Sequence, residues 1–463
     1  MSRRSTLVIA GDVHRRLQSH LLPEDGLEAA AILLCTQMRV EGLKLLVKDV
    51  ILVPHDECDR ASDRLVWPGA RLEEAIGRAE TQGLSLILMH SHPSGMFDFS
   101  AADDASDQQV ISAVAAGLYC GAEDDRVHGT AIMVPGGATK ARIYDHSMNE
   151  RSIDLVAVYG DDISLFWASD RKPMRRPMAF SEAMRQELGR LHFALIGVSG
   201  TGSVVGQQLA RIGVGKITVV DYDLIEFRNL NRILGSTLSD ARNKARKVDV
   251  FSREVASFSP LTEVNPVPMS VATRDAVLAV ANADVIFCCV DSDEGRSVCD
   301  RMAEAFLMPL FDVGVVIPVR AARDGSEAIL DISGRIDYVQ PGGSSLEDRE
   351  VFTPQSLAAE YLARADREAF SQRVREGYMR GSVEQAPSVI TVNMRAASDC
   401  VQEFIARAYP YRLDGNRGYA RTIFSLAAGE QDSSSEDDLT KSERVRLAVG
   451  LEEPLLGLPG LAR

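Results

Sequence analysis

A glycine-rich turn between an apolar strand and a helix lies near the middle of this 463-residue chain. Residues 191–196 have the pattern of a buried strand, the turn occupies residues 197–202, and residues 203–212 have helical spacing. Two more apolar strands follow at residues 216–220 and 285–290. Strands that alternate with helices in this way predict a doubly wound, mostly parallel α/β sheet of the Rossmann-like kind.

The turn itself is typical of a nucleotide-binding site. Its glycines are Gly197, Gly200 and Gly202, and their backbone N–H groups together with the following helix N-terminus favour an anion. Ser199 stands where a second glycine usually lets the backbone approach a phosphate. Asp221 ends the next strand and can hold a ribose, in NAD or in ATP alike. These residues predict nucleotide binding and leave the nucleotide open.

A second group of functional residues lies much nearer the N-terminus. The apolar strand at residues 84–92 ends in His90-Ser-His92, and the helix predicted from residue 100 onward begins with Ser100 and Asp103. Because side chains alternate along a strand, both histidines lie on one face. Two histidines and one carboxylate are the ligands of a catalytic zinc ion with one open position. An isolated His-x-His pair is a weak signal, however, and Ser100 with Asp103 is also a plausible helix capping box.

The combined spacing of these four residues is more specific than its parts. His90-x-His92-Pro, followed by Ser100-x-x-Asp103, resembles the JAMM motif of the JAB/MPN metalloprotease family over roughly residues 1–165. The resemblance implies an α/β metalloprotease domain in which His90, His92 and Asp103 bind Zn²⁺. It implies cleavage of an amide or isopeptide bond after the C-terminal glycine of a ubiquitin-like protein.

The same resemblance implies two further catalytic residues. The family uses a glutamate on an upstream element beside a small-residue, apolar run, and Glu28 fits that position best. Glu41 is the alternative. The glutamate would be the general base for a zinc-bound water, whose pKa falls to about 7. Ser100 would stabilise the oxyanion.

A set of polar residues follows the glycine-rich turn in an order that a dehydrogenase does not need: Asp221, Asn229, Arg232, Lys244 and Asp291. With the turn, they resemble the ThiF/MoeB family and the adenylation domains of ubiquitin-activating enzymes, across roughly residues 172–410. The resemblance implies that Asp221 holds the ribose of ATP and that Asp291 organises Mg²⁺. It also implies that three residues neutralise the triphosphate: Asn229, Arg232 and Lys244.

The ThiF resemblance also implies a homodimer formed through this domain. Arg175 would correspond to an arginine that each copy supplies to its partner's site, with Arg171 and Arg176 as alternatives. The implied cargo is a small ubiquitin-like or sulfur-carrier protein. A separate conjugating or sulfur-transfer protein would then receive it.

The cysteines depart from the pattern of that family. Many relatives carry two Cys-x-x-Cys pairs for a structural zinc, whereas this chain has seven scattered cysteines and no such pair. Residues 340–348, where the first pair would fall, contain serines and acids. The crossover segment that carries a thioester cysteine in some relatives has none, and Cys288, Cys289 and Cys400 are predicted to be buried. We therefore expect the reaction to stop at an acyl-adenylate.

Composition limits the partners. A formal net charge of -15 and a pI near 5.1 argue against nucleic acid or an anionic membrane as the main partner. The sequence has no secretory signal and no apolar run of the roughly 20 residues that a membrane span requires. Scattered cysteines without a disulfide pattern favour a reducing compartment. These features together predict a cytoplasmic protein.

The sequence therefore predicts a fusion of two enzymes. The expected parts are a zinc peptidase domain (1–165), a linker with a possible arginine arm (166–190), an adenylation domain (191–410) and a C-terminal extension (411–463) with an acidic, Ser-rich linker at residues 431–438. Two alternatives stay open. One is a scaffold in which only one domain is catalytically active, and the other is an NAD-dependent oxidoreductase.

Overall fold

The computed structural model describes residues 4–118, 121, 124–145, 147–170, 175–321, 327–368, 389–443 and 446–463. These residues form two compact units. The first unit runs to Arg176 and includes Ala305–Leu307 and Arg446–Glu452, and the remainder forms the second unit. The predicted domain boundaries at residues 165, 190 and 410 stay predictions. No helix in the described part of the chain is both long and apolar enough to cross a membrane.

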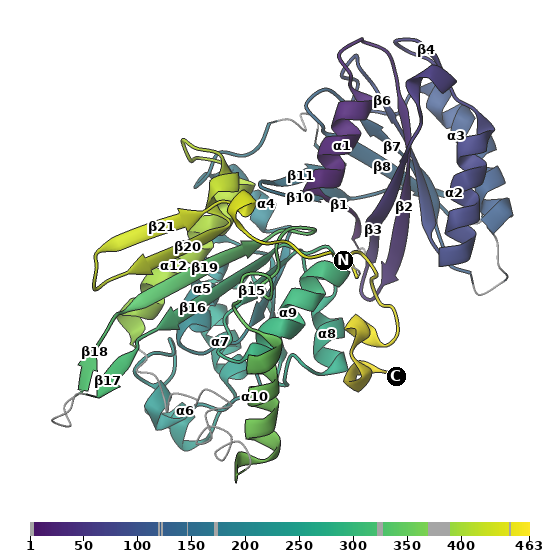
Figure 1. Ribbon diagram of the computed structural model, residues 1–463. Helices are drawn as coiled ribbons and strands as arrows, with labels where there is room; N and C mark the ends of the chain where they lie inside the picture. Colours follow the sequence, from purple (N-terminus) through teal and green to yellow (C-terminus); the bar gives the residue numbers. More distant parts are fainter. Residues whose placement is uncertain are drawn as a thin grey trace. The chain divides into compact units, whose positions relative to one another are not determined.

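The first unit is built on a nine-stranded mixed sheet with the order β11-β10-β1-β3-β2-β6-β7-β8-β9 (Figure 1). Its strands are β1 (Ser5–Ala10), β2 (Ala30–Arg39), β3 (Leu43–Leu52), β6 (Ser85–Ser91), β7 (His128–Met133), β8 (Thr139–Tyr144), β9 (Glu150–Ser152), β10 (Leu155–Tyr159) and β11 (Ile163–Trp167). A separate short hairpin consists of β4 (Asp59–Arg60) and β5 (Leu65–Val66). The helices are α1 (Gly11–Leu21), α2 (Gly69–Gln82) and α3 (Ala101–Leu118).

The two faces of this sheet bury different residues of the same strands. Leu33 and Ile87 pack in one core with residues of α1, whereas Ile32 and Leu88 pack in a second core with residues of α2 and α3. This division follows from the period of two along a strand. Even-numbered residues of β2 and β6 therefore face α3. His90 belongs to that set, so the sheet directs its side chain toward the helix that carries Asp103.

The second unit is built on an eight-stranded sheet with the order β14-β13-β12-β15-β16-β19-β20-β21. Its strands are β12 (His192–Ile196), β13 (Lys216–Val220), β14 (Glu263–Val267), β15 (Val285–Cys288), β16 (Leu310–Val316), β19 (Ser333–Val339), β20 (Arg421–Ser425) and β21 (Glu430–Ser434). The strands from β14 to β16 are parallel, and the last three are antiparallel to their neighbours. A hairpin of β17 (Val319–Ala321) and β18 (Glu327–Ile329) lies outside this sheet.

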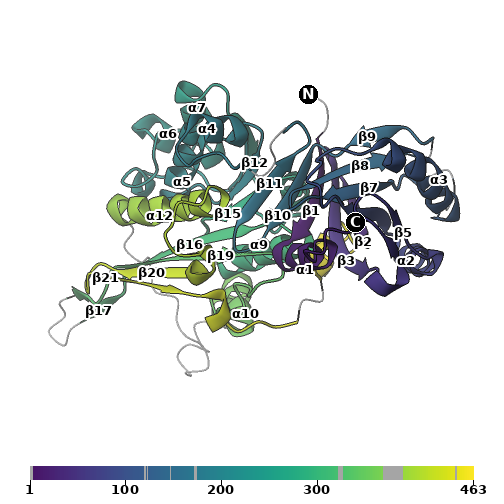
Figure 2. The same cartoon turned by 90° about the horizontal axis from the view of Figure 1, so that it is seen from above.

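Helices cover both faces of the parallel part. They are α4 (Glu182–Leu188), α5 (Gly200–Ile212), α6 (Leu238–Arg242), α7 (Lys247–Phe258), α8 (Arg274–Val280), α9 (Asp293–Ala305), α10 (Pro354–Ala365) and α12 (Ile390–Ala408). In the two views α5, α7 and α12 lie on one face and α9 on the other, and Figure 1 shows α8 beside α9 (Figures 1 and 2). Right-handed crossovers require this split, because the strand order reverses after β14.

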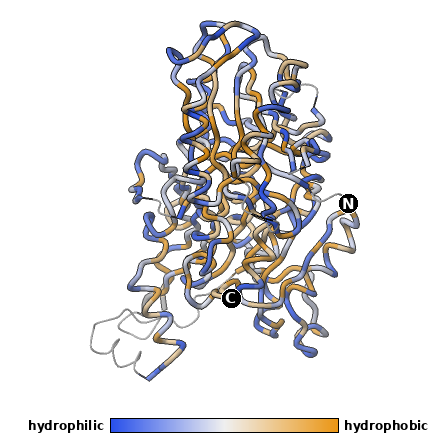
Figure 3. The backbone as a smooth tube through the Cα atoms, turned by 90° about the vertical axis from the view of Figure 1, so that its right-hand side faces the viewer, coloured by the Kyte–Doolittle hydropathy of each residue, from blue (hydrophilic) through white to orange (hydrophobic). Residues whose placement is uncertain are grey.

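Aromatic side chains fill the core beneath α12. Phe404 of that helix makes edge contacts with Phe193, Phe287 and Phe311 on three neighbouring strands, with ring centroids 5.0–6.0 Å apart. In both units the hydrophobic residues concentrate along the interior strands, and hydrophilic residues mark the outer helices and turns (Figure 3). The predicted doubly wound α/β class is therefore confirmed for the second unit.

Two local predictions differ from the structure. Helix α5 begins at Gly200 rather than at residue 203, so the last part of the glycine-rich turn is already helical. The predicted acidic, Ser-rich linker is wrong, because residues 430–434 pair with β20 as the edge strand β21, with Ile423 opposite Asp432. An edge strand needs only backbone pairing on one side, so exposed polar side chains do not prevent it.

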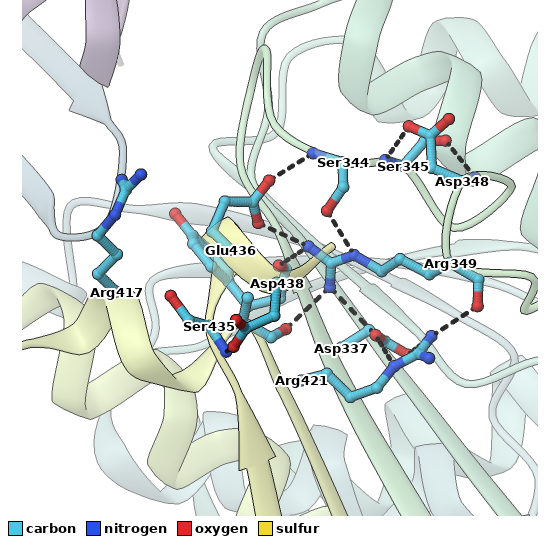
Figure 4. Close-up of polar contacts among 12 residues, drawn as sticks. Asp337, Ser344, Ser345, Asp348, Arg349, Arg417, Arg421, Ser435, Glu436 and Asp438 are labelled. Carbon is cyan, nitrogen blue, oxygen red and sulfur yellow. Dashed lines mark hydrogen bonds and ion pairs between the residues drawn. The ribbon is translucent and has the colours of Figure 1, made fainter. Parts of the chain in front are cut away.

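The segment expected to replace a Cys-x-x-Cys pair forms a buried ion-pair cluster (Figure 4). Arg349 is fully buried and donates hydrogen bonds to Asp337 at 3.1 Å, to Ser344 at 2.9 Å and to Glu436 at 3.0 Å. Arg421 of β20 donates to the same Asp337 at 2.8 Å. A buried arginine is stable only when its N–H groups are paired, and this one is. The cluster thus ties β19, β20 and the segment after β21 together through side chains.

Candidate functional sites

The first unit brings His90, His92 and Asp103 together, with ligand atoms that all lie within 4.8 Å of one another. The Nε2 atoms of the two histidines are 3.0 Å apart. Asp103 Oδ1 lies 3.1 Å from Nε2 of His90, and Oδ2 lies 3.5 Å from Nε2 of His92. His90 lies at the end of β6, His92 directly follows that strand, and Asp103 lies in the first turn of α3. The strand end and the next helix therefore bring the three side chains to one point.

The hydrogen bonds around this cluster suit a metal ion. Nδ1 of His92 lies 2.9 Å from the carbonyl oxygen of Met96, so the proton of a neutral ring belongs on Nδ1 and leaves Nε2 available as a ligand. Burial alone would raise the pKa of Asp103, but hydrogen bonds with the histidines and the N–H of Ser100 hold it well below its usual value. Two imidazole nitrogens and an ionised carboxylate are a suitable donor set for zinc.

Glu28 lies beside the cluster because of the register between β2 and β6. Ala30 pairs with His90, and the N–H of Ser91 donates to the carbonyl of Ala29 at 3.0 Å, so this pairing continues and sets Glu28 opposite His92. The Glu28 backbone is fixed by a hydrogen bond from its N–H to Ala61 at 2.8 Å. Burial raises the pKa of the Glu28 carboxyl, and the two histidines oppose that effect.

The two other residues expected near the cluster differ in position. Ser100 forms a capping box with Asp103: its N–H donates to Asp103 Oδ2 at 2.6 Å, and its Oγ accepts from the N–H of Asp103 at 3.2 Å. The two interpretations of this pair are therefore compatible, because the cap fixes the carboxylate that is expected to bind metal. Glu41 is exposed in the turn after β2, at the end of the strand remote from Glu28.

A cavity of about 750 Å³ lies on the α1 side of the sheet, at the end of β6 that His92 follows. Its lining includes Leu27, which precedes Glu28, and Pro93, which follows His92. The opposite wall is the C-terminal half of α1, with Gln18 and Ser19 among its residues. The volume is within the range of about 300–1,000 Å³ that is usual for ligand pockets. The cavity lies on the face of the sheet that packs against α1, whereas Asp103 comes from α3 on the other face.

The glycine-rich turn of the second unit connects β12 to α5. A Cβ atom on Gly202 would lie 1.9 Å from the carbonyl oxygen of Gly197, and one on Gly200 would lie 2.3 Å from Nδ2 of Asn393 and 3.1 Å from Cδ of Arg232. Gly202 therefore requires glycine, because backbone blocks a side chain there, whereas a side chain at Gly200 would have to displace Asn393. The same contacts show that Arg232, distant from the turn in sequence, lies against it.

Asp221 is attached to the same turn. Its carboxylate is 9% exposed and accepts hydrogen bonds from the N–H groups of Val198 and Asp223, both at 2.8 Å. Burial raises the pKa of Asp221, and the positive charge of Lys247 opposes that effect. The Nζ atom of Lys247 lies 2.6 Å from Asp223 and 4.0 Å from Asp221. Lys247 is thus the lysine next to the expected ribose site.

The sequence predicted Lys244 at the phosphates, whereas the lysine that lies beside Asp221 is Lys247. Lys244 is exposed in the turn after α6, with a left-handed backbone (φ 48°), whereas Lys247 is the first residue of α7 and is 5% exposed. The signal that could have found it is the change from the polar run before residue 246 to the amphipathic pattern of α7. A lysine that opens a helix near a strand end can point into the site.

The remaining predicted residues have mixed surroundings. Asn229 is 5% exposed, and its side-chain oxygen accepts from the N–H of Glu226 at 2.9 Å, so it holds the loop after β13. Asp291 is exposed just after β15. Partial burial is the main cause of the raised pKa of Tyr222. The nearby carboxylates of Asp223, Asp291 and Asp221 raise it further. Acidic groups therefore gather where Mg²⁺ was expected.

The predicted arginine arm is exposed in part, and two of the predicted buried cysteines are in the core. Arg175 is exposed, and Arg176 forms an ion pair with Asp162 at 3.5 Å within the first unit. Arg171 lies outside the described residues. Cys288 and Cys400 are fully buried as predicted, whereas Cys289 is only partly buried. A hydrogen bond with Cys299 and then burial raise the pKa of the Cys288 thiol, and burial raises that of the Cys400 thiol. Thiols of this kind are poor nucleophiles, because the reactive form is the thiolate.

Comparison with known families defines the class of each unit. Residues 11–133 match the family model for prokaryotic homologs of the JAB domain, and residues 174–345 match the model for the ThiF family. The chain is therefore a fusion of a JAB domain with a ThiF-family domain.

The similar curated proteins include enzymes named ubiquitin-like modifier-activating enzyme 5. The protein of Culex quinquefasciatus is 26% identical over 186 residues, which are 37% of this chain and 44% of the relative. That of Caenorhabditis elegans is 29% identical over 185 residues, which are 37% of this chain and 41% of the relative. The chain thus spans less than half the length of these relatives.

The solved structure of E. coli MccB with ATP has 17% identity and a TM-score of 0.43, and the match covers 57% of this chain and 68% of that one.

Proposed function

We propose that the chain is a bifunctional enzyme: it hydrolyses a peptide or isopeptide bond after a ubiquitin-like protein with Zn²⁺, and it adenylates the C-terminal carboxylate of a ubiquitin-like or sulfur-carrier protein with ATP and Mg²⁺. The observation that carries the first activity is the convergence of His90, His92 and Asp103 beside Glu28 in the JAB unit. The second activity rests on the ThiF unit, where Asp221 and Lys247 adjoin the glycine-rich turn.

In the hydrolytic reaction, the residues around the cluster would handle protons and position the substrate. A bound zinc ion would polarise the scissile carbonyl and make a water molecule acidic. Glu28 would take a proton from the attacking water at its carboxylate and deliver it to the leaving nitrogen as the C–N bond breaks. The Ser100 O–H would donate to the carbonyl oxygen as negative charge develops there. The cavity beside Leu27 and Pro93 would hold another part of the polypeptide, on the α1 side of the sheet.

In the adenylation reaction, a carboxylate oxygen of the cargo attacks the α-phosphorus of ATP, the bond from that phosphorus to the bridging oxygen breaks, and pyrophosphate leaves. The N-terminus of α5 and the turn would hold phosphate. Asp221 would accept a ribose hydroxyl, and Asn229, Arg232 and Lys247 would surround the phosphates. Asp291 would bind Mg²⁺. Positive charge and fixed geometry suffice for this chemistry, because the protein forms no covalent bond.

The partners follow from the same proposal. The cargo would be a small protein with a free C-terminal carboxylate, and a separate conjugating or sulfur-transfer protein would accept it from the adenylate. We further propose a homodimer through the ThiF domain, in which Arg175 reaches the site of the second copy. The buried thiols of Cys288 and Cys400 favour transfer to another protein over a thioester on this chain.

The competing function is a scaffold in which one domain is inactive. Variants that each disable one proposed site distinguish it from a bifunctional enzyme. Asp291→Ala should abolish ATP–pyrophosphate exchange with the cargo and leave hydrolysis of a ubiquitin-like fusion unchanged. His90→Ala should do the reverse. A wild-type chain that shows only one activity across a panel of ubiquitin-like proteins supports the scaffold. Calorimetric titration with NAD in place of ATP tests the oxidoreductase, which requires NAD to bind.

A further inference from the structure

The first turn of α3 is held by a buried polar network that lies outside the cluster itself. Arg142 of β8 is 3% exposed, and its Nη1 donates to Asp104 at 2.6 Å while its Nε donates to Asp107 at 2.9 Å. Its guanidinium also stacks on the ring of Phe99, with Cζ 3.9 Å from the ring centroid. Phe99 immediately precedes Ser100, and Asp104 immediately follows Asp103. Arg142 therefore contacts residues on both sides of the segment that carries the carboxylate ligand.

The network reaches the sheet through Asp107. This residue is 6% exposed, and its Oδ2 accepts hydrogen bonds from Thr130 of β7 at 2.7 Å and from Tyr144 of β8 at 2.9 Å. Asp107 lies one helical turn after Asp103, so it projects from nearly the same side of α3. Nη2 of Arg142 lies 2.7 Å from the same carboxylate oxygen as an ion pair, without a hydrogen bond of its own. The hydrogen bonds that are formed nevertheless connect the first two turns of α3 to β7 and β8 through buried side chains.

The strands involved connect the network to the histidines. β7 lies directly next to β6, with Ile132 opposite His90, and β8 lies next to β7. The network therefore fixes the helix that carries Asp103 to the same sheet that positions His90 and His92. Without the network, the start of α3 would be held to the sheet mainly by apolar packing farther along the helix, at Ile111 and Val114.

We propose that Arg142 is a positioning residue for the metal site: it sets the distance between Asp103 and the two histidines, and so sets the affinity for zinc. This inference rests on the proposed metal-dependent function. Arg142 does not touch the ligand atoms, and it acts through Phe99, Asp104 and Asp107. Residues that orient metal ligands from outside the coordination sphere typically change metal affinity about 10- to 100-fold.

The test compares arginines at the two ends of α3. Arg126 binds Asp124 at 2.9 Å and the carbonyl of Leu118 at the C-terminal end of the helix, and its side chain is also largely buried, at 12% exposed. Zinc affinity is measured on the full chain by competition with a chromogenic chelator, and the thermal midpoint is recorded for each variant. Arg142→Met should raise the zinc Kd about 10- to 100-fold. Arg126→Met should lower the thermal midpoint without changing that Kd.

Two outcomes would overturn the inference. One is a zinc Kd in Arg142→Met equal to that of the wild type, and the other is an equal loss of affinity in Arg126→Met. If Arg142→Met does not fold, Asp104→Ala removes one contact at a largely exposed side chain, and a zinc Kd raised in that variant supports the inference while an unchanged Kd refutes it. A wild-type chain that binds no zinc is a different result, because it refutes the proposed metal-dependent function instead.

Discussion

Replacing Lys247 with methionine should weaken ATP binding far more than the same change at Lys244. Methionine keeps most of the apolar stem and removes the charge, so the buried site is not left with a large cavity. Nζ of Lys247 lies 4.0 Å from Asp221, and its side chain is 6% exposed. At that distance and an effective dielectric constant of about 20, two unit charges interact by about 4 kcal/mol. A phosphate held at the turn would gain a similar interaction.

Solvent screening reduces this figure, because Asp223, the closer partner of Lys247, has a side chain that is 50% exposed. We therefore expect a net loss of about 2 kcal/mol in Lys247→Met, which is roughly a 30-fold increase in the Kd for ATP with Mg²⁺. Lys244→Met should change that Kd less than about threefold, since its side chain is exposed. Isothermal titration calorimetry measures both. An equal loss in the two variants, or a loss only in Lys244→Met, would refute the assignment made from the position of Asp221.

Three further predictions concern the JAB unit and the cysteines. Asp103→Ala should lower bound zinc from about one ion per chain to almost none by elemental analysis, whereas Glu28→Ala should retain zinc and lose hydrolysis of a ubiquitin-like fusion. Ser19→Trp should fill the cavity and raise KM for that fusion at least tenfold with zinc content unchanged, while Arg16→Trp, exposed on the same helix and outside the lining, should alter neither. After incubation with ATP and cargo, a non-reducing gel should show no adduct that dithiothreitol removes; such an adduct, absent in Cys400→Ala, would instead establish a thioester on this chain.

The metal ligands could be predicted from the sequence because local periodicity determines them. His90 and His92 are two residues apart in a strand, so they share a face in any register. Asp103 was recognisable because it stands at the start of the next helix, at the spacing of a known motif. The position of Glu28 opposite His92 depends on the pairing of β2 with β6, which are far apart in sequence. Only the family resemblance pointed to it.

The residues that were missed depend on tertiary structure in the same way. Lys247 could be distinguished from Lys244 only by knowing where α7 begins and how its first turn meets Asp223. Arg142 contacts residues 35 and 38 positions away, and nothing in its local sequence marks it as more than a strand residue. The edge strand that contains Gln431 was mistaken for a linker because composition reports exposure and not backbone pairing. Side-chain identity alone does not show where a helix begins or which distant segments pair.

The two proposed activities are chemically compatible in a way that bears on why one chain would carry both. Hydrolysis of an amide after the last residue of a small protein yields a free C-terminal carboxylate and an amine. Adenylation needs that same free carboxylate as its nucleophile toward the α-phosphorus. The product of the first reaction is thus the substrate of the second, while a blocked or extended C-terminus is a substrate for the first reaction only. On this logic a fusion cargo should support ATP–pyrophosphate exchange in the wild type but not in Glu28→Ala, and the pre-cleaved cargo should restore exchange in that variant.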